Sequence, residues 1–151
     1  EYYHDKVAKQ LPQLWGFQAA GAAPFVAGHP IEKPETIATA IRIGKPASWD
    51  LAVAARDDSG GLIDAVTDDQ ILDAYRILAD KEGFFVEPSS AASVAGLLQQ
   101  ASRGLVDAGS TIVCTVTGNG LKDTQWALES AKDPVVVPVD VKAAAAALGL
   151  A

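Results

Sequence analysis

The stretch that decides the fold is TIVCTVTGNGLKD, residues 111–123. Its first six residues are apolar or β-branched, and such a run bounded by turn residues is typical of a buried strand in a parallel sheet. The glycines of TGNG (117–120) then permit a tight polar turn, and a helix is expected to begin near Leu121. In open α/β sheets, ligands bind outside the carboxyl ends of the strands. The sequence therefore predicts a ligand-binding turn that offers the Thr117 hydroxyl, the Asn119 carboxamide and free amide N–H groups.

A second interpretation of the same turn is a plain connection between strand and helix, with glycines required only by backbone geometry. Spacing alone does not separate the two, because short glycine motifs are weak evidence. TGNG does not match GxGxxG, and no GK[ST] follows it. Neither dinucleotide binding nor P-loop chemistry is predicted.

Composition narrows the class of protein. A chain of 151 residues suits one domain or a large part of one, and a hydrophobic fraction of 49% supplies a core. The net charge of −7 argues against binding to nucleic acid, whose phosphates need a basic face. We expect no membrane span and no signal peptide. His4 and His29 lie outside any metal-ligand spacing, so no metal site is predicted.

The single cysteine, Cys114, lies inside the expected strand at 111–116. It is interpreted as a small buried hydrophobe and not as a nucleophile. One cysteine allows no internal disulfide, which fits a reducing compartment. The predicted location is therefore cytoplasmic.

Expected helices and strands alternate along the chain. The other strands are expected at residues 14–18, 62–66, 84–86 and 135–139, and the helices at 1–10, from 24, at 35–41, 49–56, 68–82 and 88–102, from 121, and at 141–150. This alternation predicts an α/β fold with a parallel-rich sheet covered by helices on both faces. No linker or repeat divides residues 1–151.

Two helix starts carry further signals. Thr67 and Gln70 match a capping box, and we interpret Asp68 and Asp69 as charges that suit the helix dipole and not as paired catalytic carboxylates. The helix that begins at Pro88 has only small side chains in its first turns. Such a face fits where another backbone or a ligand lies close, and Glu87 just before it is either a helix-terminal charge or a ligand contact.

Three stretches agree with one family, in the family's order. They are AIRIGKPASW (40–49), FVEPSSAASVAGL (85–97) and TVTGNGLKD (115–123), and QAAGAAP (18–24) fits as well. Together they closely resemble threonine synthase, and the likeness extends from about residue 17 to residue 123. Three linked motifs are much more specific than any one of them.

The resemblance implies a fold-type II enzyme that uses pyridoxal 5′-phosphate. Such an enzyme converts O-phospho-L-homoserine and water to L-threonine and phosphate by β,γ-replacement, and it is a homodimer. By the same resemblance, the Thr117 hydroxyl hydrogen-bonds the pyridine nitrogen of the cofactor and Gly118 leaves room for the ring. Ile43 and Gly44 line the face of the ring, and Glu87 belongs to the cofactor-binding set.

The resemblance also implies that parts of the site lie elsewhere. In the family, the Schiff-base lysine and the glycine-rich phosphate loop precede these motifs, and no lysine of this chain, Lys122 included, stands in that lysine's context. Residues 1–151 therefore resemble the carboxyl-terminal portion of the large cofactor-binding domain, with no catalytic residue of their own, and we expect the chain alone to be inactive. The alternatives are a related dehydratase or sulfhydrylase of the same fold, against which AIRIG-PASW weighs, and a non-catalytic α/β module that binds a small ligand or a partner.

Overall fold

A two-stranded parallel sheet lies at the centre of the molecule. The computed structural model describes residues 3–150, with the side chain of Ser130 left out. The strands are β1 (Trp15–Ala19) and β2 (Leu62–Val66), which pair residue for residue along their whole length. Both strands confirm the predictions, with β1 displaced by one residue.

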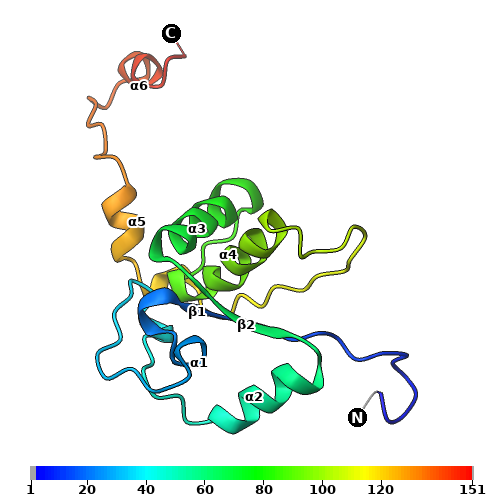
Figure 1. Ribbon diagram of the computed structural model, residues 1–151. Coiled ribbons are helices and arrows are strands. Elements are labelled where there is room, and N and C mark those ends of the chain that lie inside the picture. The colour runs from blue at the N-terminus through cyan, green and yellow to red at the C-terminus, as the bar shows by residue number, and fades with distance from the viewer. Residues whose placement is uncertain (1–2, 151) are drawn as a thin grey trace.

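Helices cover both faces of this sheet, as predicted. The connection from β1 to β2 contains η1 (Ala20–Ala22), α1 (Pro24–Ala27), η2 (Thr39–Ile41) and α2 (Trp49–Asp58). After β2 come α3 (Asp68–Glu82) and α4 (Pro88–Ser102). Figure 1 shows α1 and α2 on one side of the sheet, and α3 and α4 packed together on the other.

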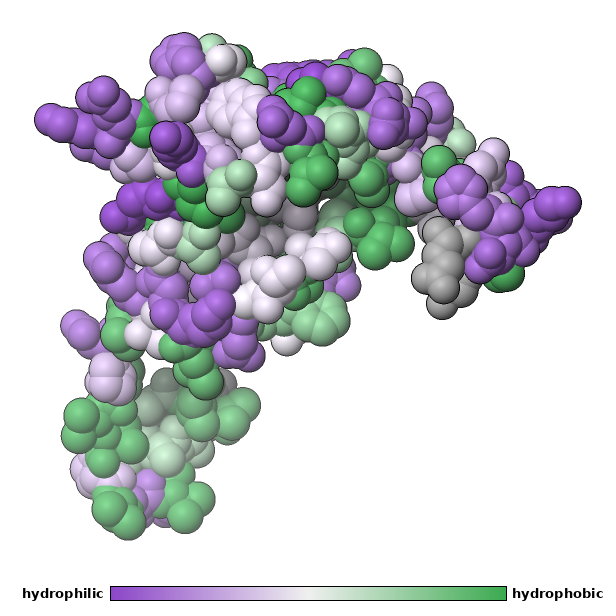
Figure 2. All heavy atoms as spheres, turned by 90° about the horizontal axis from the view of Figure 1, so that it is seen from below, coloured by the Kyte–Doolittle hydropathy of each residue, from purple (hydrophilic) through white to green (hydrophobic). Residues whose placement is uncertain are grey.

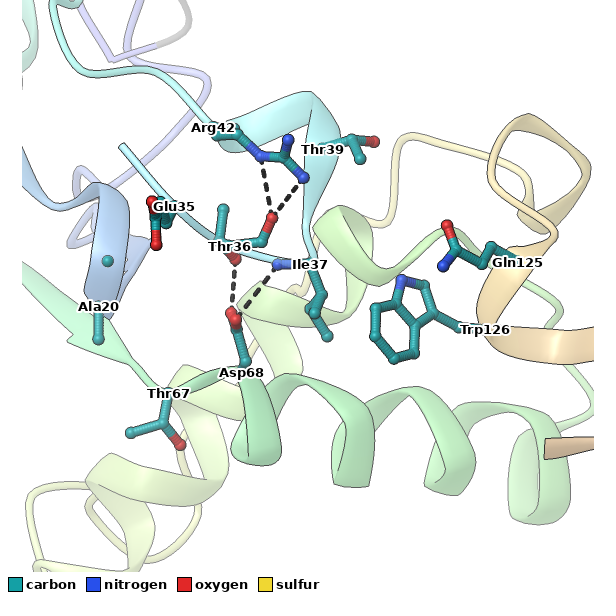
Figure 3. A pocket seen from close by; sticks show the side chains of 11 residues that line it. Ala20, Glu35, Thr36, Ile37, Thr39, Arg42, Thr67, Asp68, Gln125 and Trp126 are labelled. Atoms are coloured by element: carbon teal, nitrogen blue, oxygen red, sulfur yellow. Dashed lines mark hydrogen bonds between the residues drawn. The ribbon is translucent and has the colours of Figure 1, made fainter. Parts of the chain in front are cut away.

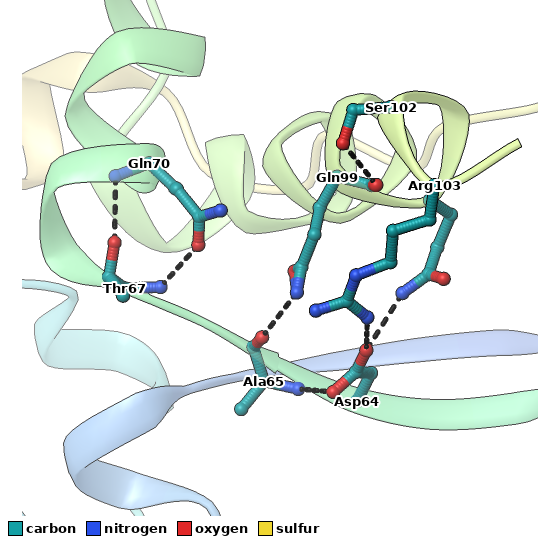
Figure 4. A network of polar contacts seen from close by, with 8 residues as sticks. Asp64, Ala65, Thr67, Gln70, Gln99, Ser102 and Arg103 are labelled. Atoms are coloured by element: carbon teal, nitrogen blue, oxygen red, sulfur yellow. Dashed lines mark hydrogen bonds and ion pairs between the residues drawn. The ribbon is translucent and has the colours of Figure 1, made fainter.

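Local signals fix both ends of α3. The Thr67 hydroxyl accepts the N–H of Gln70 at 3.2 Å, and the Gln70 side chain accepts the N–H of Thr67 at 2.8 Å (Figure 4). At the other end, Gly83 has a φ of 72°, and the N–H of Phe84 donates to the carbonyl of Leu78 at 2.9 Å. A left-handed glycine of this kind is a common helix stop. The predicted capping box is confirmed, and α3 ends at Glu82, as its predicted range requires.

The core lies between α3, α4 and the sheet. Its buried residues include Val66, Ile71, Ala74, Tyr75, Leu78, Ala91, Ala92 and Ala95. The small side chains of α4 let its neighbours approach closely: a Cβ atom on Gly96 would lie 2.1 Å from the Phe17 ring. The sequence predicts either another backbone or a ligand close to this helix. At Ala91, Ala92 and Gly96 the close neighbours are protein atoms of the core.

A polar network attaches the end of α4 to the middle of β2 (Figure 4). The Asp64 carboxylate accepts from Gln100 Nε2 at 2.8 Å and from Arg103 Nη1 at 2.7 Å. Gln99 Nε2 donates to the Ala65 carbonyl at 3.2 Å. Gln100 is only 1% exposed, so its hydrogen bond satisfies an amide that would otherwise be costly to bury.

Three predicted strands are wrong. Residues 111–116 form no strand, residues 135–139 form none, and of residues 84–86 only Val86 makes an isolated antiparallel bridge, to Asn119. A strand requires a neighbour that takes up its N–H and C=O groups. Within residues 3–150 the sheet consists of β1 and β2 alone and pairs with none of these stretches, so apolar pattern alone does not make them strands.

Two predicted helices are also wrong. Within 1–10, the described residues 3–10 form turns and bends, and residues 1 and 2 lie outside the described part. Of residues 35–41, only the 3₁₀ turn η2 is helical. The helix expected from Leu121 is divided into η3 (Gly120–Lys122) and α5 (Gln125–Ser130), and the last helix is α6 (Val141–Ala147). Short isolated helices are marginal without a face to pack against.

Residues 131–150 extend away from the body as an arm that ends in α6 (Figure 1). Exposed apolar residues on the arm are Val135, Val136, Val139, Val141, Leu148 and Leu150, and Figure 2 shows apolar residues gathered over this protruding part. Among the helices of residues 3–150, none combines the length and the apolar character needed to cross a bilayer.

Candidate functional site

The TGNG turn is held against the start of α4 by backbone hydrogen bonds. The N–H of Glu87 donates to the Gly118 carbonyl at 3.0 Å, and the N–H of Gly118 donates to Ser90 Oγ at 2.7 Å. The N–H of Gly120 donates to the Phe85 carbonyl at 3.0 Å. Ser90 and Glu87 are both 4% exposed. The turn is therefore fixed by a buried hydroxyl and two main-chain contacts.

Both glycines of the turn pack closely on side chains. A Cβ atom on Gly118 would lie 1.8 Å from Glu87 Oε1, and one on Gly120 would lie 2.5 Å from the Phe85 ring. On the side where its Cβ would point, the space beside Gly118 is thus occupied by Glu87. Room for a cofactor ring next to Gly118 stays a prediction.

Glu87 is a buried carboxylate with one cationic partner. Lys122 Nζ lies 3.5 Å from Glu87 Oε1, and the Lys122 side chain is 63% exposed, whereas that of Glu87 is 5% exposed. Burying a carboxylate is costly unless a charge or hydrogen bonds compensate it. Lys122, which belongs to the TGNGLKD motif, therefore stabilises the charge of Glu87 beside the turn.

Besides Asn119, the exposed polar residue of the turn is Thr117. Its side chain is exposed, and within residues 3–150 its hydroxyl makes no hydrogen bond to protein, whereas Asn119 Oδ1 accepts the N–H of Leu121 at 3.0 Å. A neutral hydroxyl on a fixed turn can donate to, or accept from, a ring nitrogen. The chemistry of Thr117 therefore fits a pyridine ring.

A cleft of about 600 Å³ lies at the carboxyl ends of both strands. Ala20 and Gly21 follow β1 and line it, Thr67 and Asp68 follow β2 and line it, and Trp126 of α5 contributes to its wall. Figure 3 shows Trp126 facing this space from the side opposite the strand ends. The position agrees with the rule that ligands of open α/β sheets bind beyond the carboxyl ends of the strands.

Ile43 and Gly44 lie on the segment that follows η2. A Cβ atom on Gly44 would lie 1.9 Å from the carbonyl oxygen of Ile31, and the N–H of Ile31 donates to the Gly44 carbonyl at 2.9 Å. Close approach of two backbones thus requires glycine at position 44. Ile43 is 49% exposed. The contacts of Gly44 run to Ile31, so a place for these two residues on the face of a cofactor stays a prediction.

The segment that contains η2 and the TGNG turn both contact the start of α4. The N–H of Ala40 in η2 donates to Ser89 Oγ at 3.0 Å, next to Ser90, which holds Gly118. The Thr39 hydroxyl donates to Asp123 Oδ2 at 3.1 Å, just after η3. The structure therefore gathers η2, the TGNG turn and Glu87 around the first turn of α4.

Other titratable groups near the site are not arranged as nucleophiles or metal ligands. Cys114 is half-buried and not in a strand, so its predicted place as a buried strand residue is wrong; burial still raises the pKa of its thiol, which disfavours the thiolate that a nucleophile needs. Burial, with the nearby charge of Asp123, also raises the pKa of Tyr75. In residues 3–150, no three His, Cys, Asp or Glu side chains gather as metal ligands do.

Sequence reasoning does not identify Thr36, Arg42 and Asp68 as a group. Asp68 fits the helix dipole, as predicted, but it also binds the segment before η2 (Figure 3). Thr36 and Asp68 are separated by 32 residues. The one available signal was that Asp68 directly follows β2, where side chains reach the carboxyl edge of the sheet.

Relatives with curated names agree along the whole chain. The threonine synthase of Mycobacterium leprae (strain TN) is 55% identical over 150 residues, which cover 99% of this chain and 42% of the relative. The threonine synthase of Halalkalibacterium halodurans is 55% identical over 142 residues, which cover 93% of this chain and 40% of the relative. This chain thus spans about two fifths of the length of each.

Solved structures with a similar fold include two other enzymes. A threonine deaminase from T.th. is similar with a TM-score of 0.50 and 25% identity, over 59% of this chain and 34% of that one. An L-serine ammonia-lyase from Rhizomucor miehei has a TM-score of 0.57 and 24% identity, over 78% of this chain and 39% of that one. The second likeness concerns the fold alone.

The family described as "Pyridoxal-phosphate dependent enzyme" matches residues 2–118. That range includes both strands, α1 to α4 and the first half of the TGNG turn, and it agrees with the fold-type II architecture of the solved neighbours. This chain therefore belongs to the family of pyridoxal-phosphate-dependent enzymes.

Proposed function

We propose that the complete protein is a threonine synthase, which converts O-phospho-L-homoserine and water to L-threonine and phosphate. The observation that carries the proposal is the 55% identity to threonine synthases along 99% of the chain. Of the three motifs that resemble this enzyme, the second forms the start of α4, the third contains the turn bound to it, and the first is tied to it by the Ala40–Ser89 hydrogen bond. We further propose that residues 1–151 form part of the large cofactor-binding domain.

In this proposal the chain holds the pyridine side of the cofactor. Thr117 would hydrogen-bond the pyridine nitrogen, because its hydroxyl is exposed and the turn beneath it is fixed by Ser90 and Glu87. Ile43 and Gly44 would approach the ring from η2, which the Ala40–Ser89 hydrogen bond ties to α4. Gly118, which has no side chain, would leave space for the cofactor ring beside the turn.

Pyridoxal 5′-phosphate, when bound, supplies the electron sink that carbanion chemistry requires. A neutral hydroxyl at Thr117 does not hold a proton on the pyridine nitrogen as a carboxylate would, so it tunes the strength of that sink. Glu87 lies nearby, but Lys122 is its ion-pair partner at 3.5 Å. Glu87 would border the cofactor site as one member of this ion pair.

We also propose that the protein is a cytoplasmic homodimer. The single cysteine fits a reducing compartment. The arm of residues 131–150 presents apolar side chains, and a second subunit would cover part of them.

The proposal is tested by supplying the full-length protein and pyridoxal 5′-phosphate with O-phospho-L-homoserine. Phosphate and L-threonine are expected in equal amounts. Formation of a 2-oxo acid and ammonia from serine or threonine, without threonine synthesis, would instead support the related dehydratase, which the solved neighbours make the second candidate. The 151-residue chain alone, which has no lysine in the family's Schiff-base context, is expected to release no phosphate above the rate of free cofactor.

A further inference from the structure

The segment from the end of α1 to the start of α2 has little regular structure. Between Ala27 and Trp49 the only helical element is the three-residue η2. A loop of this length has no backbone ladder to hold it, so its position depends on other contacts. The same segment contains Ile43 and Gly44, which the proposed function places at the cofactor.

The carboxylate of Asp68, at the first position of α3, anchors this segment with both oxygens (Figure 3). Oδ1 accepts the Thr36 hydroxyl at 2.5 Å, and Oδ2 accepts the N–H of Ile37 at 3.2 Å. Hydrogen bonds to an ionised acceptor are stronger than those between neutral groups. Thr36 is only 7% exposed and Asp68 is half-buried, so the contact is partly shielded from competing water.

Arg42 also binds Thr36 and so holds the two ends of the segment 36–42 together. Its Nε and Nη2 atoms donate to the Thr36 carbonyl at 2.9 and 2.6 Å, and Thr36 Oγ1 also accepts the N–H of Ala38 at 3.1 Å. Thr36, Ile37, Arg42 and Asp68 thus form one hydrogen-bonded group, here called the Asp68 cluster. It fixes the path of the chain through residues 36–42, immediately before Ile43.

The segment 36–42 and the TGNG turn are both bound to the first turn of α4. Ala40 is bound to Ser89 and Gly118 is bound to Ser90, at 3.0 and 2.7 Å. The Asp68 cluster and the TGNG turn are therefore linked through consecutive residues of α4, while Asp68 itself touches neither Ile43 nor Thr117 in its hydrogen bonds.

We infer that Asp68 is a positioning residue of the enzyme, which through Thr36 sets the position of Ile43 and Gly44 relative to Thr117. This inference rests on the proposed function, because it concerns the cofactor site. By this inference Asp68, which also lines the cleft at the strand ends, acts on the cofactor site through the segment 36–42. Its adjacent residue Asp69 is exposed and shares only the favourable charge at the start of α3.

The test compares Asp68→Ala with Asp69→Ala in the full-length protein. Both variants remove one acidic residue from the first turn of α3, so the loss of helix-dipole charge is matched. In the apoenzyme, amide exchange at Ile37 and Ala38, measured by hydrogen–deuterium exchange, is expected to be about tenfold faster in Asp68→Ala only. The dissociation constant for pyridoxal 5′-phosphate is expected to rise about fivefold to fiftyfold, again only in Asp68→Ala.

A second pair of variants tests the hydroxyl with little change of shape. Thr36→Val removes the donor to Asp68 and should reproduce the Asp68→Ala effects, whereas Thr36→Ser keeps the hydroxyl and should restore wild-type exchange and cofactor affinity. Equal effects of Thr36→Ser and Thr36→Val would overturn the inference, as would equal effects of Asp69→Ala and Asp68→Ala.

Two further results would separate this inference from the proposed function. Faster exchange at Ile37 with unchanged cofactor affinity and an unchanged spectrum of the bound cofactor would make the Asp68 cluster purely structural, and the inference would be wrong while the function stood. A wild-type protein that bound no pyridoxal 5′-phosphate would overturn the proposed function, and the inference with it.

Discussion

Thr115 and Thr117 lie two residues apart on the same exposed stretch, but they differ in what fixes them. The Thr115 carbonyl accepts a hydrogen bond from Ser93 at 3.3 Å, and its hydroxyl has no part in that contact. Thr117 directly precedes Gly118, whose N–H and carbonyl are both bound to the start of α4. The Thr117 side chain is therefore carried by the more firmly held part of the chain.

Thr117→Val in the full-length enzyme should lower turnover by about tenfold to a hundredfold, because the loss of a buried hydrogen bond costs about 1–3 kcal/mol. Valine keeps the shape of threonine, so cofactor affinity should fall less than turnover does. Steady-state assay of phosphate release and the absorption of the bound cofactor measure the two effects. Thr115→Val is the control and should match wild type; damage from Thr115→Val with none from Thr117→Val would mean that the turn is assigned wrongly.

Position 44 illustrates how a residue predicted for function can be required by packing. Gly44 accepts the N–H of Ile31 and leaves no room for a Cβ atom, which would lie 1.9 Å from the Ile31 carbonyl oxygen. The sequence presents Gly44 only as part of the AIRIG motif. The backbone of Ile31, 13 residues earlier, gives the physical reason for glycine there.

At the scale of elements, α4 connects the sheet to the candidate site. Its first turn binds η2 and the TGNG turn through Ser89 and Ser90. Its last turn binds β2 through Gln100, and Arg103, the residue that follows the helix, binds the same Asp64 carboxylate. Loosening the attachment at Asp64 should therefore affect the stability of the whole unit.

Burial acts to raise the pKa of Asp64, but the N–H of Ala65 and the side chains of Gln100 and Arg103 outweigh it, so the pKa is lowered. A carboxyl whose pKa is lower in the folded state stabilises the fold above its unfolded pKa, about 3.9, and loses that contribution as the pH falls through the folded pKa. Asp64→Asn should therefore lower the unfolding temperature at pH 7 and flatten its decline below about pH 4.

The measurement is the unfolding temperature from about pH 2 to about pH 7, a range that extends to both sides of the pKa of an unfolded aspartate. Asp73→Asn is the comparison, because the Asp73 carboxylate is 72% exposed and pairs with Arg76 on the surface. Exposed pairs contribute little, so at pH 7 this variant should melt closer to wild type. Identical curves for wild type and Asp64→Asn would contradict the role given to the network.

At the scale of the whole molecule, residues 111–116 are the clearest difference between pattern and structure. Val113 is 86% exposed and Ile112 is 46% exposed, although their sequence is that of a buried strand. The chain spans 42% of the length of its Mycobacterium leprae relative. An apolar stretch of this kind is costly to leave in water, which suggests that the rest of a longer protein covers it.

Hydrogen exchange in residues 111–116 should accordingly be slow in the full-length protein and fast in the 151-residue chain. The reason is that a strand's amides are protected only when a neighbouring strand accepts them. Exchange resolved by mass spectrometry on overlapping peptides provides the measurement, with α3 as an internal reference that should be protected in both. Equally fast exchange of residues 111–116 in both proteins would show that the stretch is no strand in either.

The sequence by itself determined the features that depend on residues close together in the chain. The capping box at Thr67, the stop at Gly83 and the start of α4 at Pro88 involve partners within a few residues, so their signals are complete in a short window. The strands β1 and β2 formed where their local pattern predicts because each has the other as its partner, and the family was recognisable from three motifs in order.

Only the tertiary structure decided which distant residues meet. The pairing of Thr36 with Asp68 spans 32 residues, and that of Asp64 with Gln100 spans 36. Such contacts depend on how the β1–β2 crossover and α4 are packed, which no local pattern specifies. The same holds for residues 111–116: their apolar pattern records a preference for burial, but strand formation requires a partner strand, and the arrangement of the chain in space determines whether one is present.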